Sequence, residues 1–184
     1  MTAIFVIIGL LLLVGLYFAS TYNRLIRART MVEEGWSGVD VQLKKRYNLI
    51  PNLIETVKGY AAHEQDTLNK VIAARNAAQS AEDIPAQQAA EQQLTTALSG
   101  FFALAEAYPD LKANQNFLQL QGELSKVEGD IEKARRYYNG TVREKNILVE
   151  SFPSNIIAGM FNFYLSDFFE VENEEQRAVP QVKF

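Results

Sequence analysis

The single histidine is the first residue whose type and context could do chemistry. His63 is followed directly by Glu64, which reproduces the first half of the H-E-x-x-H motif of zinc metalloproteases. The second histidine of that motif would stand at position 67, where this chain has Thr67. A zinc centre of this kind is therefore not predicted, and we interpret His63 as a histidine on a helix surface.

Other reactive side chains are isolated as well. The chain has no cysteine, which excludes disulfides, thiolate nucleophiles and cysteine-based zinc sites. Adjacent carboxylates, as in Glu33-Glu34, point in different directions on a helix and do not form an acid–base pair by themselves. We therefore predict no catalytic residue, no cofactor-binding residue and no metal ligand, and we expect that the protein is not an enzyme.

The composition narrows the class of protein further. Apolar residues make up 48% of the 184 residues and charged residues 22%, which is typical of a folded chain with one core. The formal net charge is −4, so the concentrated basic face that phosphate contacts require is not expected. The sequence therefore predicts no nucleic-acid partner.

An apolar segment at the start of the chain is the first element that can position the rest. Residues 1–23 carry no charged side chain, and a helix of about 20 such residues is about 30 Å long, enough to cross the core of a bilayer. A cleaved signal peptide would begin with a basic residue, whereas the first basic residue here is Arg24. We predict an uncleaved transmembrane anchor. Its residues include Ala3, Ile4, Phe5, Leu10, Leu13, Leu16, Tyr17 and Phe18.

Basic residues follow the anchor, and none precedes it. Arg24, Arg27 and Arg29 lie directly after the apolar segment. Because basic residues that flank a membrane span tend to stay on the cytoplasmic side, they are expected to set the topology. The sequence predicts a single-pass protein with its N-terminus outside and its body in the cytoplasm.

Beyond the anchor, apolar residues recur in alternating steps of three and four, which is the spacing of a helical seam. Gly35 and Gly38 leave room for a neighbouring helix to approach closely. Pro51 is expected to break or kink the chain near Leu49, because proline lacks an N–H group and clashes with the preceding turn. The residues of the seam are Leu25, Ala28, Val32, Trp36, Val39 and Leu43.

Three more helices are predicted after Pro51. They cover about residues 52–79, a stretch that begins near Pro85 and ends at Tyr108, and residues 110–149. The basic run Lys44-Lys45-Arg46 is interpreted as solvated helix surface. The predicted fold is all-α, with an N-terminal transmembrane helix that continues into an antiparallel bundle of about four long helices.

The C-terminal residues differ in character from the bundle. A segment rich in aromatic residues begins at residue 156, and an acidic tail follows from Glu170. So apolar a segment can cap the bundle, pack against another subunit or touch the membrane surface, although the carboxylates of the tail oppose contact with an anionic leaflet. The candidate interface residues are Ile156, Ile157, Met160, Phe161, Phe163, Tyr164, Phe168 and Phe169.

Four blocks of sequence carry a resemblance to a known family. They are WSGVDVQLKKRYNLIPNLIETVKGYAAHE (36–64), EAYPDLKANQNFLQLQGEL (106–124), ARRYYNGTVREKN (134–146) and SFPSNIIAG (151–159). Together with the anchor, their order and spacing resemble the LemA family of bacterial membrane proteins over essentially the full chain. The resemblance implies a membrane-anchored antiparallel bundle of long helices, and it implies no established catalytic activity.

These observations predict three parts and a non-enzymatic function. The parts are an anchor (1–23), a LemA-like helical bundle (24–155), and an aromatic segment with an acidic tail (156–184). The leading hypothesis is a scaffold or adaptor at the cytoplasmic face of the bacterial inner membrane. Its expected partners are the lipid bilayer, further copies of itself in a homo-oligomer, and other membrane proteins. The alternatives are an assembly that shapes the membrane, and a subunit or client of a membrane protease or transporter.

Overall fold

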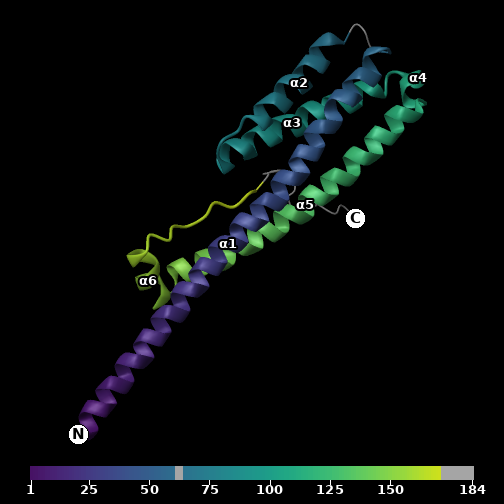
Figure 1. The fold of residues 1–184 in the computed structure, drawn as a ribbon. Coiled ribbons are helices and arrows are strands. Elements are labelled where there is room, and N and C mark those ends of the chain that lie inside the picture. Colours follow the sequence, from purple (N-terminus) through teal and green to yellow (C-terminus); the bar gives the residue numbers. More distant parts are fainter. Residues whose placement is uncertain (61–63, 171–184) are drawn as a thin grey trace, which may run out of the picture. The chain divides into compact units, whose positions relative to one another are not determined.

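The computed structural model describes residues 1–60 and 64–170, and every regular element within them is a helix (Figure 1). The all-α prediction is therefore confirmed. Two features of the sequence, His63 and the acidic tail after Glu170, lie outside the described residues. The helices are α1 (Thr2–Lys58), α2 (Gln65–Gln79), α3 (Ile84–Ala105), α4 (Pro109–Lys112), α5 (Gln115–Glu150) and α6 (Ser154–Met160).

Helix α1 continues through Pro51, so the chain does not break near Leu49, which was one of the two outcomes predicted there. A proline inside a helix leaves the carbonyl four residues earlier without its usual N–H donor, and here that carbonyl belongs to Tyr47. The guanidinium Nε of Arg75 in α2 donates a hydrogen bond of 2.9 Å to this carbonyl. The tertiary fold thereby satisfies the group that Pro51 leaves unpaired, and α1 ends only at Lys58.

The other helix boundaries follow local capping groups. Asp83 accepts a hydrogen bond of 2.7 Å from the Ala86 backbone and starts α3, with Pro85 in its first turn as predicted. Asn114 accepts one of 3.1 Å from the Phe117 backbone, so α5 begins at Gln115, after the separate turn of α4. The prediction of one helix from residue 110 to 149 is therefore wrong at its start and correct to within one residue at its end.

The chain divides into two compact units, and both α1 and α5 contribute to each. Unit 1 consists of residues 1–40 and 133–168. Among the described residues, unit 2 consists of residues 41–60 and 64–132 together with Phe169 and Glu170.

In unit 1, the part of α1 from Thr21 to Asp40 packs against residues 133–150 of α5, whereas the start of α1 is exposed. A Cβ atom at Gly35 would lie 3.2 Å from the Cα of Tyr138, so the predicted close approach of a neighbouring helix is confirmed there. A Cβ atom at Gly38 would have nothing within 4 Å, so the prediction is wrong at that glycine. Trp36 is partly buried and packs on the Tyr138 ring, with 5.4 Å between centroids. The other five predicted seam residues are buried, four of them in unit 1 and Leu43 in unit 2.

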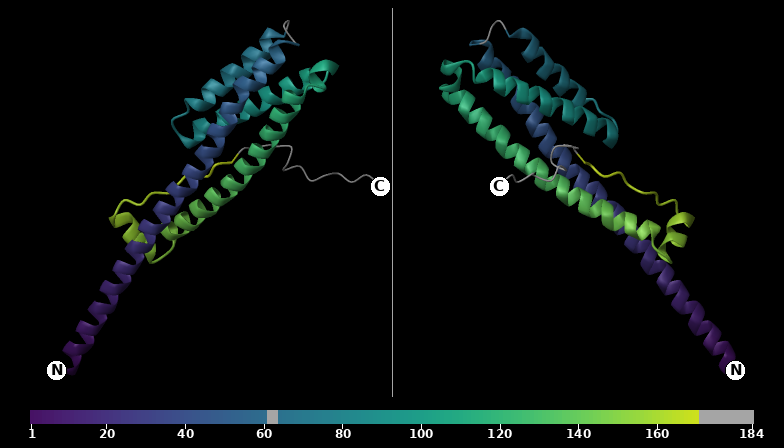
Figure 2. Two further views of the ribbon diagram at one scale, coloured as in Figure 1. Left: turned by 45° about the vertical axis from the view of Figure 1, so that its right-hand side comes forward. Right: turned by 180° about the vertical axis from the view of Figure 1, so that it is seen from behind.

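In unit 2, α2 and α3 lie side by side along the end of α1 (Figure 2). The first half of α5 completes the core, with Phe117 and Leu124 buried. Further side chains that are fully or almost fully buried in this unit are Ile50, Leu53, Val57, Leu68, Val71, Leu94, Phe101 and Leu111.

Candidate functional site

The first part of α1 exposes an apolar surface. One window of 18 residues has a mean hydropathy of 2.6, and none of it is buried, which distinguishes it from the core helix of a soluble protein. Seven of the eight predicted anchor residues are exposed, and Phe18 is partly buried. By length and composition, α1 is therefore able to cross a membrane.

Three exposed arginines mark the end of the apolar surface. The side chains of Arg24, Arg27 and Arg29 are all exposed. Arg24 and Arg27 line a hollow of about 310 Å³ together with Ser20 and Asn23. The hollow combines two guanidinium groups with two neutral polar groups, a set that suits the phosphate oxygens of an anionic group.

Next to these arginines, α6 covers one side of α1. Ile157 and Ala158 of α6 are buried against Leu25, together with Phe163. Phe163 reaches this core because α6 ends in a tight turn, in which its backbone N–H donates to the Ala158 carbonyl at 2.9 Å. Asn162, with φ of 56°, occupies the left-handed position that such a turn requires.

The segment after α6 is fastened along α5 by paired hydrogen bonds. The Asn146 side chain donates to the Ser166 carbonyl at 2.9 Å and accepts from the Ser166 N–H at 2.9 Å. Lys145 donates to the Ser166 hydroxyl at 2.5 Å, and Tyr138 donates to the Asp167 carbonyl at 2.8 Å. The position of α6 is therefore fixed by its buried contact with α1 and by the attachment of the following segment to α5.

Two titratable groups in this arrangement have shifted pKa values. Burial, followed by the nearby charge of Arg29, lowers the pKa of Lys145, and Glu33 opposes the shift. Burial, followed by the charge of Asp167, raises the pKa of Tyr138 to about 12. Both shifts arise from packing within unit 1.

A buried ion pair in unit 2 is the feature that the sequence analysis missed. Arg46 was interpreted as solvated surface, yet it is only 2% exposed and forms a salt bridge with Glu91 of α3, which is 3% exposed. It also contacts Glu128 of α5 at 2.8 Å. The prediction is wrong for Arg46, whereas its neighbours Lys44 and Lys45 are exposed as expected.

Neutral groups complete the surroundings of this ion pair. The hydroxyl of Tyr47 donates to Glu91, and Gln87 donates to the same carboxylate at 2.9 Å. Gln87 also contacts the Tyr47 hydroxyl at 2.9 Å and the Ala78 carbonyl at 3.1 Å. The network thus joins α1, α2, α3 and α5. Arg46 and Glu91 are oppositely charged and withdrawn from water, whereas the Glu128 side chain is 42% exposed, so the buried pair acts in how these helices pack.

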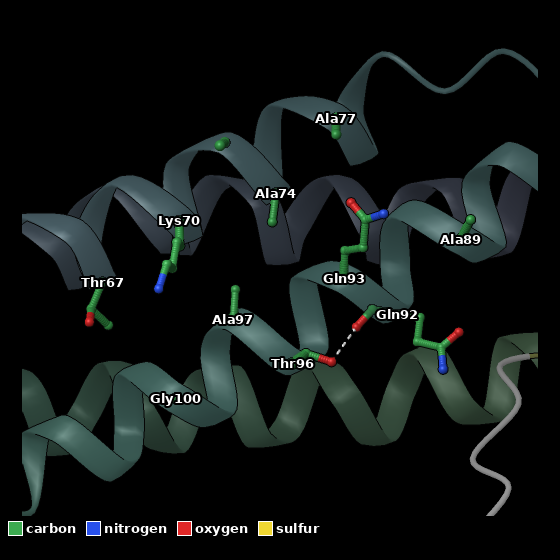
Figure 3. Close-up of a pocket in the computed structure, with 11 residues that line it drawn as sticks. Thr67, Lys70, Ala74, Ala77, Ala89, Gln92, Gln93, Thr96, Ala97 and Gly100 are labelled. Carbon is green, nitrogen blue, oxygen red and sulfur yellow. Dashed lines mark hydrogen bonds between the residues drawn. The ribbon is translucent and has the colours of Figure 1, made fainter.

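A groove of about 990 Å³ lies between α2 and α3, and Figure 3 shows the side chains that line it. Most of them are small, and the polar ones are amides, hydroxyls and Lys70. Thr96 directs its hydroxyl to the Gln92 carbonyl of its own helix at 3.0 Å. The lining has one titratable side chain, so it lacks the pair of groups that acid–base catalysis uses.

The candidate interface residues divide into two groups. Ile157, Phe163 and Phe169 are buried, so they belong to the cores of the two units. The other five are exposed: Ile156, Met160, Phe161, Tyr164 and Phe168. Among residues 1–60 and 64–170, no three His, Cys, Asp or Glu side chains are grouped so that they could hold a metal ion.

The described residues therefore define an all-α protein with one helix that is long and apolar enough to span a membrane. The model of the LemA family matches residues 35–184, and the chain belongs to the LemA family. Protein LemA of Metamycoplasma hominis is 24% identical over 176 residues, which cover 94% of this chain and 80% of that relative. The resemblance found in the sequence is confirmed, and the matched range begins after the apolar segment of α1.

Proposed function

We propose that this LemA-family chain is a membrane-anchored scaffold of the bacterial inner membrane, which acts through protein–protein contacts and self-association and not through catalysis. The observation that carries the proposal is the continuity of α1. Its first residues expose only uncharged and mostly apolar side chains, and from Thr21 onward the same helix supplies buried residues to both units. An anchor in lipid would thus be joined to the folded body without a flexible linker.

The proposed topology places the N-terminus outside the cell and both units in the cytoplasm. Arg24, Arg27 and Arg29 support it, because flanking arginines favour the cytoplasmic side of a membrane. The chain has no cysteine, so single cysteines can report the side directly.

We expect a membrane-impermeant maleimide to label Thr2→Cys in intact spheroplasts and to label Ser37→Cys only after lysis. Both side chains are exposed, so accessibility to reagent and not burial decides the result. Labelling of Ser37→Cys in intact spheroplasts would reverse the orientation. If membranes are washed at alkaline pH and the protein is recovered in the soluble fraction, the proposal that α1 anchors it in the membrane is wrong.

The proposal of a scaffold predicts contacts between molecules at exposed helix positions. Leu118 and Leu124 of α5, both in unit 2, serve as a test position and its control. They are the same residue type, but Leu118 is 50% exposed and Leu124 is 4% exposed. We expect a photo-crosslinking amino acid at position 118 to join two chains in living cells, whereas the same group at position 124 reacts only within its own chain.

The masses of the crosslinked products distinguish the alternatives. Products with the mass of two copies support self-association. Products that contain only other membrane proteins would contradict self-association and support the alternative, a subunit or client of a membrane protease or transporter. If position 118 and the other exposed positions of α2, α3 and α5 give no intermolecular product, the scaffold proposal is wrong.

A further inference from the structure

Helix α6 and its flanks expose large apolar side chains that recur every four residues. Phe152, Ile156, Met160 and Tyr164 are 80%, 55%, 63% and 73% exposed, and we call these four residues the α6 surface. The sequence from residue 151 to 166 contains no charged side chain. A patch of large apolar side chains without charges is unusual on a surface that faces water.

The orientation of the α6 surface is fixed by contacts on the other side of the helix and after its end. The opposite side of α6 is buried against α1 through Ile157 and Ala158. The turn at Asn162 directs Phe163 into the same core, and the paired hydrogen bonds between Asn146 and Ser166 hold the segment that follows. The fold therefore fixes which side of α6 faces outward.

Ring contacts establish the level of α6 along α1. The Phe161 ring lies 5.8 Å from that of Phe18 and 4.7 Å from that of Tyr22, measured between centroids. Phe18 and Tyr22 belong to the last turns of the charge-free segment, which ends at Asn23. Because a hydrocarbon core of about 30 Å takes up about 20 helical residues, these two rings would lie at its boundary with the headgroups.

The charges at this level suit an anionic lipid surface. Arg24 and Arg27 are exposed, lie about two to two and a half turns after Phe18, and line the hollow described above. Arg29 lies 5.7 Å from the centroid of the Phe163 ring, which places a third cation beside the α6 region.

We infer that the α6 surface is a second membrane contact, seated in the headgroup–acyl boundary of the leaflet from which α1 emerges. The inference rests on the proposed membrane anchoring and adds an interfacial attachment to it. Lipid fits this surface better than a second copy of the chain, because the aromatic contacts with Phe18 and Tyr22 bring α6 to the level where lipid surrounds α1. With two attachments, α1 cannot rotate or tilt freely in the bilayer.

The cysteine-free chain allows a direct test by spin labelling of full-length protein in vesicles of phosphatidylethanolamine and phosphatidylglycerol. Labels are placed one at a time at Ile156→Cys and Met160→Cys, both exposed positions. Leu10→Cys reports the anchor, and Glu34→Cys, about 18 Å beyond Tyr22 along α1, serves as the exposed control in water. Power saturation then compares collision with oxygen, which concentrates in lipid, and with a water-soluble nickel chelate.

We expect labels at 156 and 160 to have an oxygen-to-nickel accessibility ratio several-fold above that at 34 and closer to that at 10. If position 10 lies in lipid while 156 and 160 match position 34, the interfacial contact is wrong and the anchor stands. If 156 and 160 are shielded from both reagents and show spin–spin broadening between chains, a second copy covers the surface and the inference is wrong. If position 10 is itself accessible to nickel, both proposals are wrong.

Discussion

Replacing Arg46 with methionine should lower the free energy of unfolding of unit 2 by about 3–5 kcal/mol, the usual cost of removing one partner from a buried ion pair. The cost arises at Glu91, whose side chain is 4% exposed and cannot recover water when the guanidinium is gone. Glu128 is affected less, because its side chain is 42% exposed and can be hydrated. Hydrogen exchange of the α3 backbone amides in the full-length protein measures the loss.

The double variant Arg46→Met/Glu91→Gln should recover much of that stability. The amide oxygen of a glutamine at 91 can still accept from Tyr47, and its NH₂ group no longer faces a guanidinium. We therefore expect a coupling energy of about 1–3 kcal/mol between the two positions, as is found for residues in direct contact. Lys45→Met is the matched control and should change little, since Lys45 is exposed. Equal destabilisation by Lys45→Met and Arg46→Met would contradict the role of the ion pair.

Placing leucine at Gly35 should destabilise unit 1 by about 1–3 kcal/mol, the usual cost of inserting a side chain into a close contact. Its Cβ would meet the Cα of Tyr138 at 3.2 Å and the hydroxyl of Thr141 at 3.3 Å. The first of these atoms belongs to the backbone of α5, so the helices must move apart. Trp36 packs on Tyr138 and is the one tryptophan of the chain, so its fluorescence during denaturant unfolding reports the effect.

Gly38→Leu is the control for this prediction. Nothing lies within 4 Å of a Cβ built at Gly38, so the substitution should add stability by up to about 1 kcal/mol through helix propensity. The two substitutions are therefore expected to have opposite signs within one turn of the same helix. A gain in stability at both positions would show that α1 and α5 do not approach each other closely at Gly35.

The sequence predicts the helices of this protein well because their cores are built from periodic apolar residues. Leu25, Val32 and Val39 recur at helical spacing, and all three are buried in unit 1. Along α5, Phe117, Leu124, Ile131 and Tyr138 recur every seven residues and are likewise buried. Periodicity is a local property of the chain, so it can be read without knowledge of the fold.

Features that depend on distant partners could not be predicted in this way. Arg46 stands in a basic run that is typical of solvated surface. Its charge can be buried only because the carboxylate of Glu91 approaches it from another helix. Pro51 carries a strong local signal for a helix end, which is overridden because Arg75 of α2 binds the carbonyl that the proline leaves free. In both cases the deciding group is a side chain in a different helix.

The burial of the aromatic segment could be predicted from the sequence only in part. Its composition indicates that it must be covered by something, but composition does not distinguish Ile157, which is buried, from its neighbour Ile156, which is 55% exposed. The one local signal was Asn162, because asparagine favours the left-handed position that ends a helix and reverses the chain. With that turn in place, Phe163 would have been assigned to the core.

The division of α1 between two units has a consequence for biosynthesis. Residues 41–132 of unit 2 are contiguous, so this part of the chain leaves the ribosome as one block, whereas unit 1 needs residues 133–168 to pair with residues 1–40. At about 5–20 residues per second, translation of the intervening block takes about 5–20 s. Throughout that interval the nascent chain displays Leu25, Val32 and Val39 without their partners from α5 and α6. A ribosome that stalls before residue 133 would therefore leave a product in which these apolar side chains of α1 remain exposed.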